Sequence, residues 1–201
     1  LTGGHTQMYL MHDEKKNELL GESVDDAIGE AFDKTAKLIG LGYPGGARIE
    51  ELAKYGDENY FKLPKPLLND PTFNFSFSGI KTHINLLTKK NKIDDNFRKN
   101  ISSSFQKTIT EIIISKIEKV LEFLNKKNIS LKSTSIVGGV ANNFYIRRNL
   151  ENLFEKKNIE LYYPIKEMMS DNAAMIAWAC IKNYSNKNAD IFFKPNPRLK
   201  I

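Results

Sequence analysis

One long amphipathic stretch constrains the fold of this chain more than any other feature. Between Asp94 and about Lys127, apolar residues recur at spacings of three and four, which is the period of one helix face. The residues on this face are Phe97, Ile101, Phe105, Ile109, Ile112, Ile117, Val120 and Leu124. The pattern predicts a core helix against which the rest of the chain packs, and core packing explains it without any functional role.

Shorter segments with different periods surround this stretch. A helix is expected from Ser23, which can cap it, with Val24, Ile28 and Phe32 on its buried face and Gly40 and Gly42 at its end. Further helices are predicted at 48–55, 80–89, 142–156 and 171–183, and strands around Gly3-Gly4 and at 73–77, 134–137 and 160–163. Cys180, beside Trp178 in the last helix, is expected in the core. The alternation of strands and helices indicates an α/β fold.

Composition excludes several classes of protein. The chain has 201 residues, 41% hydrophobic and 27% charged, which is typical of a globular protein and not of a disordered one. No apolar run reaches the roughly 20 residues of a membrane-spanning helix, so no membrane association is expected. The single cysteine excludes an internal disulfide and suits a reducing cytoplasm. The first residue is not Met and no secretory signal is visible, so we expect a piece of a longer protein.

Charge is distributed unevenly along the chain. Residues 1–60 carry 6 basic and 12 acidic side chains, whereas residues 61–201 carry 24 basic and 12 acidic ones. A basic surface of this kind can bind the phosphates of a nucleic acid. The 25 Lys, 5 Arg and 20 Asn are also typical of solvated faces encoded by an AT-rich genome. Charge alone leaves both interpretations open.

Three Gly-Gly pairs lie at expected strand ends or helix starts: Gly3-Gly4, Gly45-Gly46 and Gly138-Gly139. Glycine lets the main chain approach a ligand closely and lets successive N–H groups converge on an anion. Each pair could equally serve an ordinary turn, but three in one α/β chain favour a nucleotide or another phosphorylated ligand. None fits the P-loop or the dinucleotide-binding fingerprint.

Acidic side chains form a second group of candidates. Asp26, Glu30 and Asp33, with Asp25 nearby, align on the first expected helix without basic partners at the right spacing. They indicate metal, ribose or proton chemistry, or alternatively a solvated helix start favoured by the helix dipole. Asp171 is expected to be either the N-cap of the last helix or a metal ligand that needs partners. The spacing of the three histidines along the sequence does not form a metal-binding pattern that could supply these partner ligands. They are His5, His12 and His83.

Together these strings resemble one family, the tRNA N6-adenosine threonylcarbamoyltransferases, once described as O-sialoglycoprotein endopeptidases, in its bacterial or organellar branch. The resemblance covers essentially all 201 residues and roughly the last three fifths of the family's length. The matching strings, in order along the chain, are Thr2–Gln7, Leu20–Ala27, Gly29–Lys34, Gly40–Gly46, Phe75–Thr82, Val137–Val140 and Ser170–Ala177.

The resemblance implies an actin-like ATPase fold, present here mainly as the C-terminal lobe, with the N-terminal lobe outside the chain. It implies transfer of a threonylcarbamoyl group from threonylcarbamoyl-adenylate to the N6 amine of the adenosine beside the anticodon, in tRNAs that read codons beginning with A. The turn Leu1-Thr2-Gly3-Gly4 would lie against the phosphate and carbamoyl end of the adenylate. Asp33 would accept hydrogen bonds from the ribose, Gly46 would approach the nucleoside through its backbone, and Asn143 would hold the opposite side.

The resemblance also implies a metal and partners. Asp171 would be one ligand of a single metal ion per subunit, usually Fe²⁺ and possibly zinc, with two histidine ligands from the part of the family that precedes this chain. The implied partners are tRNA, a related actin-fold subunit and a small ATPase, in the cytoplasm or, in a eukaryote, in the mitochondrial matrix or another organelle.

Other functions remain as alternatives. Because the histidine pair is not in this sequence, the chain could instead be a truncated product or a non-catalytic paralogue that docks partner subunits. A metalloprotease is disfavoured because the sequence has no H-E-x-x-H helix, and a generic actin-fold kinase is disfavoured by the specific strings.

Overall fold

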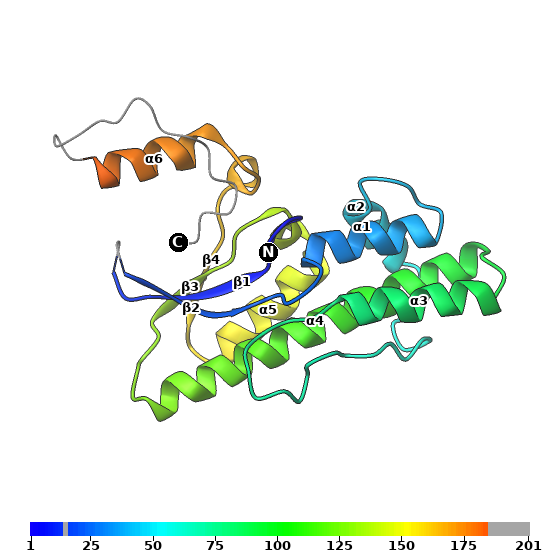
Figure 1. Cartoon of the computed structure of the whole chain (residues 1–201), viewed down its shortest axis with the longest axis horizontal. Coiled ribbons are helices and arrows are strands. Elements are labelled where there is room, and N and C mark those ends of the chain that lie inside the picture. Colours follow the sequence, from blue (N-terminus) through cyan, green and yellow to red (C-terminus); the bar gives the residue numbers. More distant parts are fainter. Residues whose placement is uncertain (14–15, 185–201) are drawn as a thin grey trace. The chain divides into compact units, whose positions relative to one another are not determined.

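The structure is a computed structural model that describes residues 1–13 and 16–184. The chain forms two compact units, residues 1–170 and residues 171–201, and each is described by itself (Figure 1). The elements of the first unit are β1 (Gln7–Met11), β2 (Asn17–Glu22), α1 (Ile28–Leu38), α2 (Gly46–Ala53), α3 (Ser78–Lys90), α4 (Asp95–Lys126), β3 (Ser133–Ser135), the 3-10 turn η1 (Gly139–Asn142), α5 (Phe144–Lys156), β4 (Glu160–Tyr162) and the 3-10 turn η2 (Lys166–Met168). The second unit contains α6 (Ala173–Asn183).

Helix α4 is the centre of the first unit, as its periodicity predicts. Asp94 caps it, because its Oδ1 accepts a hydrogen bond from the Phe97 N–H at 2.9 Å. Phe105 is completely buried and packs edge to face against Phe32 of α1, with ring centroids 4.9 Å apart. The predicted helices α2, α3 and α5 are confirmed to within a few residues, and α1 ends before Gly40, whose φ of +78° few other residues adopt.

The strands form two pairs, which confirms a mixed α/β class. Strands β1 and β2 are antiparallel, with an irregularity between Met8 and Tyr9. Strands β3 and β4 are parallel and are connected through α5, as a parallel pair requires. Within the described part of the chain, each pair is a separate two-stranded sheet.

The prediction that a helix begins at Ser23 is wrong. The Ser23 N–H donates to the Thr6 carbonyl at 2.8 Å, and the Val24 N–H donates to the Phe75 carbonyl at 3.0 Å. These bonds keep the chain extended after β2, so α1 begins only at Ile28. Val24, expected on the buried face, is therefore 60% exposed.

The strand predicted at 73–77 is also wrong, because only a single bridge forms there, between Ser23 and Phe75. The next donors bond to a side chain instead of a strand: the N–H groups of Phe77 and Ser78 donate to Oδ1 of Asp25 at 2.8 and 3.3 Å. This turns the chain directly into α3. Phe75 and Phe77 are nevertheless buried on one side, with stacked rings 6.0 Å apart.

In the second unit, helix α6 begins at Ala173 and is capped by Asn172, whose Oδ1 accepts from the Met175 N–H at 3.0 Å. The cap is therefore not Asp171, the other residue considered for that position. Cys180 is exposed and Trp178 is 61% exposed, so the prediction that they lie in a core is wrong. Within the described residues, we find no helix with the length and apolar character needed to span a bilayer.

Asp25 is expected to stabilise the first unit by holding the start of α3. Besides the two backbone bonds, its Oδ2 accepts from the hydroxyls of Ser76 and Ser78 at 2.5 and 2.6 Å. Burial raises the pKa of Asp25, but these hydrogen bonds outweigh it and hold the pKa below its ordinary value. The stabilisation is therefore complete above the ordinary carboxyl pKa and is lost as the pH falls through the lowered value.

We predict that Asp25→Ala lowers the free energy of unfolding at pH 7 by about 1 to 2 kcal/mol, as for the loss of a helix cap. Urea unfolding followed by circular dichroism measures this effect. Glu122→Gln, at an exposed position on α4, is the control and is expected to stay within about 0.5 kcal/mol of the unsubstituted chain. Equal stabilities of the two variants would contradict the role given to Asp25.

Candidate functional site

The turn at Thr2–His5 is held by its own threonine. The Thr2 N–H donates to the His5 carbonyl at 2.9 Å, and the N–H groups of His5 and Gly4 donate to the Thr2 hydroxyl at 2.9 and 3.3 Å. Gly3 and Gly4 are exposed, and a Cβ at either position would meet no atom within 4 Å. The turn therefore presents bare main chain to its surroundings, as a ligand-facing turn requires.

Helix α1 begins against this turn. The Gly29 N–H donates to the Thr2 carbonyl at 3.1 Å, and a Cβ on Gly29 would lie 2.7 Å from the Cα of Gly3. The hydroxyl of buried Thr6 accepts from the Ile28 N–H at 2.9 Å, so it serves as the cap that Ser23 does not supply. The positive end of the α1 dipole thus lies beside the turn, where it favours a negatively charged group.

The third glycine pair contacts the same turn from another direction. The Leu1 amino group donates to the Val137 carbonyl at 2.8 Å, and the Val140 N–H donates to the Leu1 carbonyl at 3.1 Å. Gly138 has a φ of +97°, and any Cβ there would overlap Leu1 and the Thr2 side chain. The structure therefore brings the first and third glycine pairs together, although they are 135 residues apart in the sequence.

Asp33 and the second glycine pair also lie together. Asp33 Oδ1 accepts from the Gly45 N–H at 2.7 Å, and a Cβ on Gly45 would lie 3.0 Å from the Asp33 Cα. Gly46, the first residue of α2, faces open space. Asp33 thus sets the entry into α2, while Gly46 is left accessible at the helix start.

Asn143 has a structural role that the sequence did not indicate. Its side chain caps α5, since Oδ1 accepts from the Ile146 N–H at 2.9 Å, and Nδ2 donates to Oε1 of buried Gln106 at 2.8 Å. Glu50 of α2 accepts from the Phe144 N–H at 2.7 Å, which fixes the start of α5 to the helix that begins at Gly46. The predicted contact of Asn143 with a ligand remains a prediction.

The four acidic residues that were predicted to lie on the first helix have different roles in the structure. The prediction that it lacks basic partners is wrong, because Lys34 Nζ lies 2.6 Å from Asp26 and 2.7 Å from Glu30. Asp25 serves α3, as described above. Only Asp33 of the four lies beside a glycine pair, so the three-carboxylate site suggested by the spacing does not form.

Asp171 belongs to the second unit, where it is exposed immediately before the cap of α6. Over residues 1–13 and 16–184, no three side chains of the His, Cys, Asp and Glu types gather closely enough to bind a metal ion. The described residues of this chain therefore do not form a complete iron or zinc site by themselves.

Comparison with known proteins decides the family. Residues 1–178 match the family model described as tRNA N6-adenosine threonylcarbamoyltransferase. The chain belongs to this family. Relatives bearing that name include proteins of Thermosipho africanus (44% identical, 100% of this chain and 60% of the relative), Wigglesworthia glossinidia brevipalpis (39%, 98% and 57%) and Rickettsia canadensis (41%, 92% and 55%). The chain thus spans somewhat more than half the length of these threonylcarbamoyltransferases.

The sequence analysis identified the glycine pairs of this chain but missed the residues that position them. Thr6, Glu50 and Gln106 are polar residues without a distinctive spacing, so no local pattern identifies them. Gly29 gave a usable signal, because a glycine inside a helix usually marks a close approach of another backbone.

Substitutions at Gly45 and Gly46 distinguish the glycine that is tightly packed before α2 from the glycine that is left accessible at its start. In Gly45→Ala, the new Cβ would overlap the Ala36 side chain, so we predict a loss of about 1 to 3 kcal/mol in the free energy of unfolding. In Gly46→Ala, the Cβ meets nothing, and a change within about 0.5 kcal/mol is expected. Urea titration of both variants tests this prediction. An equal loss of stability in the two variants would contradict it.

The Leu1 amino group gives a pH-dependent prediction for a chain that begins at this residue. Burial lowers the pKa of this amine from 8.0 to about 6. Since the unfolded chain binds the proton more tightly, stability is expected to rise from pH 6 to pH 8 and to fall as the pH drops through 6. N-terminal acetylation should remove this part of the pH dependence in thermal unfolding. An unchanged dependence after acetylation would contradict the assignment.

Proposed function

We propose that the protein containing this chain transfers the threonylcarbamoyl group from threonylcarbamoyl-adenylate to the N6 amine of the adenosine next to the anticodon, in tRNAs that read codons beginning with A. The observation that carries the proposal is the Thr2–His5 turn, whose bare glycines lie beside the start of α1. A helix N-terminus next to exposed main-chain N–H groups suits the phosphate of an adenylate.

The remaining residues suit the rest of the adenylate. Asp33 would accept hydrogen bonds from the ribose hydroxyls, and the open space at Gly46 would let the nucleoside approach the backbone. Asn143 Nδ2 carries a second hydrogen besides the one given to Gln106, and this hydrogen is the group we assign to the ligand.

The proposed reaction requires little chemical participation by side chains. The substrate is a mixed carboxylic–phosphoric anhydride, so its carbonyl is already activated and AMP is the leaving group. The adenosine amine attacks the carbonyl carbon, the bond to the phosphate oxygen breaks, and the amine proton is released. The task of the site is to hold the anhydride and the amine in line and to stabilise the negative charge on the departing AMP. A covalent nucleophile is not required.

We also propose the setting in which this site works. The first unit would form most of the C-terminal lobe of an actin-like ATPase fold, with the N-terminal lobe supplied by residues outside this chain. The partners would be tRNA, a related actin-fold subunit and a small ATPase. The location would be the cytoplasm, or the mitochondrial matrix or another organelle in a eukaryote.

Asp171 is proposed as one ligand of a single Fe²⁺ or zinc ion, with two histidines from outside this chain. In the full-length protein, Asp171→Ala is expected to lower the bound metal, measured by mass spectrometry of the purified protein, at least tenfold. Full metal content in this variant would contradict the assignment.

Asp33→Asn in the full-length protein tests the adenylate site. The amide oxygen of Asn can still accept from the Gly45 N–H, so the fold is expected to be kept, whereas the charge that favours the ribose hydroxyls is lost. We predict at least tenfold weaker binding of a non-hydrolysable adenylate analogue by calorimetry and a matching loss of tRNA modification.

Asp95→Asn is the control for this experiment, because Asp95 is 85% exposed at the start of α4 and lies outside the proposed site. It is expected to bind and to react like the unsubstituted protein. Wild-type affinity in Asp33→Asn, with an unchanged melting temperature, would remove Asp33 from the site. If the unsubstituted full-length protein bound no analogue even with metal present, and modified no tRNA, the chain would belong to a non-catalytic docking protein instead.

A further inference from the structure

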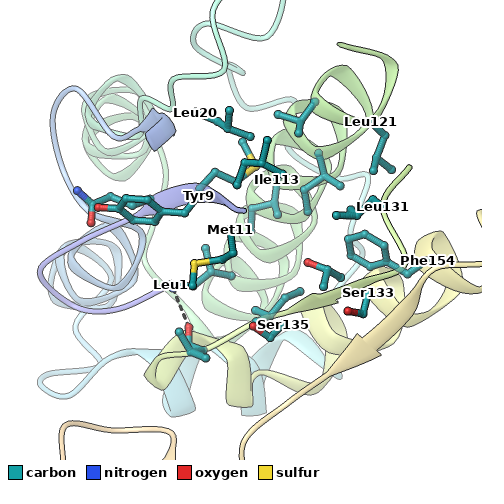
Figure 2. A pocket seen from close by; sticks show the side chains of 18 of the residues that line it. Leu1, Tyr9, Met11, Leu20, Ile113, Leu121, Leu131, Ser133, Ser135 and Phe154 are labelled. Atoms are coloured by element: carbon teal, nitrogen blue, oxygen red, sulfur yellow. Dashed lines mark hydrogen bonds between the residues drawn. The ribbon is translucent and has the colours of Figure 1, made fainter. Parts of the chain in front are cut away.

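Helix α4 changes character along its length. Its C-terminal half lines an apolar groove beside Leu1 (Figure 2), and the side chains that it contributes are Ile113, Ile117, Val120, Leu121 and Leu124. Its N-terminal half carries buried polar side chains, of which the largest is Gln106, with an exposed fraction of 5%. Burial of an amide costs free energy unless its polar atoms are bonded, so Gln106 requires a specific partner.

The partner of the Gln106 side chain lies on another helix. Buried Thr108 and Thr110 are satisfied within α4, because each hydroxyl donates at 2.8 Å to a main-chain carbonyl one turn earlier. The Gln106 side chain instead reaches α5, where its Oε1 accepts a hydrogen bond from Nδ2 of Asn143 at 2.8 Å. Both side chains are buried, so water competes little for this bond.

A single main-chain group determines the orientation of both side-chain amides. The Ile146 N–H can only donate, and it donates to Oδ1 of Asn143 at 2.9 Å. Nδ2 of Asn143 is thereby turned toward Gln106, which must present its own oxygen in return. Reversal of either amide would place two donors or two acceptors against each other.

This orientation decides what Asn143 can recognise in a ligand. Oδ1 and one hydrogen of Nδ2 are engaged within the protein, so the second hydrogen of Nδ2 is directed by the same bonds. A donor of this kind selects a ligand atom that accepts a hydrogen bond. In the proposed adenylate complex, the Thr2–His5 turn takes the phosphate and Asp33 takes the ribose. The adenine base, whose ring nitrogens are acceptors, is the part left for Asn143.

We propose that Gln106 is a positioning residue, which holds the Asn143 amide so that its free hydrogen points at an acceptor nitrogen of the adenine base. Gln106 itself touches no substrate, and its effect on specificity passes through Asn143. The inference rests on the proposed function, because it requires an adenylate in contact with Asn143.

The position of α5 does not depend on Gln106 alone. Lys107, the next residue of α4, donates from Nζ to Oε1 of Glu58 at 3.1 Å, and Oε2 of Glu58 accepts from the Tyr145 hydroxyl at 2.8 Å. This second connection holds the first turn of α5 against α4. Removal of the Gln106 oxygen is therefore expected to free the Asn143 amide without displacing the helix.

Two variants of the full-length protein test the positioning role. Gln106→Met keeps an unbranched side chain of similar length and removes the acceptor, whereas Gln106→Glu keeps an oxygen acceptor in either protonation state. The probes are a non-hydrolysable adenylate analogue and three forms of it, in which N1, N3 or N7 of the adenine is replaced by C–H. Calorimetry gives the dissociation constant of each probe.

We expect one of the three replacements to weaken binding to the unsubstituted protein about tenfold, as for a lost hydrogen bond. Gln106→Met should bind the adenylate analogue itself about tenfold more weakly, and the same replacement should then cost less than about threefold, because the contact is already lost. Gln106→Glu should restore the discrimination. Full discrimination in Gln106→Met would overturn the proposal.

Lys107→Met is the matched control, since it loosens the start of the same helix and leaves the bond between Gln106 and Asn143 in place. It is expected to discriminate between the probes like the unsubstituted protein, whatever its melting temperature. Loss of discrimination in Lys107→Met as well as in Gln106→Met would indicate a general loosening of α5 and would overturn the proposal.

The unsubstituted protein separates the two levels of the argument. Equal binding of all four probes would overturn the inference about Gln106 and leave the proposed function intact. If none of the probes bound, the proposed function would be wrong, and the inference with it.

NMR spectroscopy of the Asn143 side-chain amide needs no substitution at Gln106. In the ligand-free full-length protein, one hydrogen of Nδ2 is expected to be protected from exchange with water by its bond to Gln106. The signal of the second hydrogen is expected to shift when the adenylate analogue binds. Rapid exchange of both hydrogens in the free protein would show that Gln106 does not hold the amide, and would overturn the proposal.

Discussion

The close main-chain approach at Leu1–Gly3 is the constraint on which the rest of the candidate site depends. Three segments bond to these residues: the residues before β1 through His5, the start of α1 through Gly29, and the segment after β3 through Val140. Two of the approaches leave no room for a Cβ, at Gly29 and at Gly138. Small changes in this turn therefore affect the direction of a helix, a strand and a 3-10 turn together, because packed backbones have little room for relaxation.

The helices could be predicted from the sequence because their signals are local. The stripe of α4 and the glycines after α1 depend on residues within a few turns of one another. The failures at Ser23 and at 73–77 have the opposite origin. There the backbone donors bond to Thr6, Phe75 and Asp25, and Asp25 lies 52 residues before Phe77, so no window of sequence contains both partners.

The candidate site was predictable to a similar degree. The glycine pairs stand out because few other residues permit such approaches, and the structure gathers two of them around one turn and places the third beside Asp33. The prediction of a site formed by the aligned carboxylates was wrong, because the spacing of residues does not show where a helix begins. With α1 starting at Ile28, Asp25 lies outside it and bonds to the start of α3, and Lys34 forms ion pairs with Asp26 and Glu30.

The Leu1 amine is buried where the candidate turn bonds to the segment after β3. An ammonium group in an apolar groove is unfavourable, and its lowered pKa of about 6 reflects that cost. In a longer protein, a neutral peptide N–H would donate to Val137 in its place, and the cost would disappear. The turn that we assign to the adenylate phosphate would then keep its bond to Val137 without the cost of a buried charge.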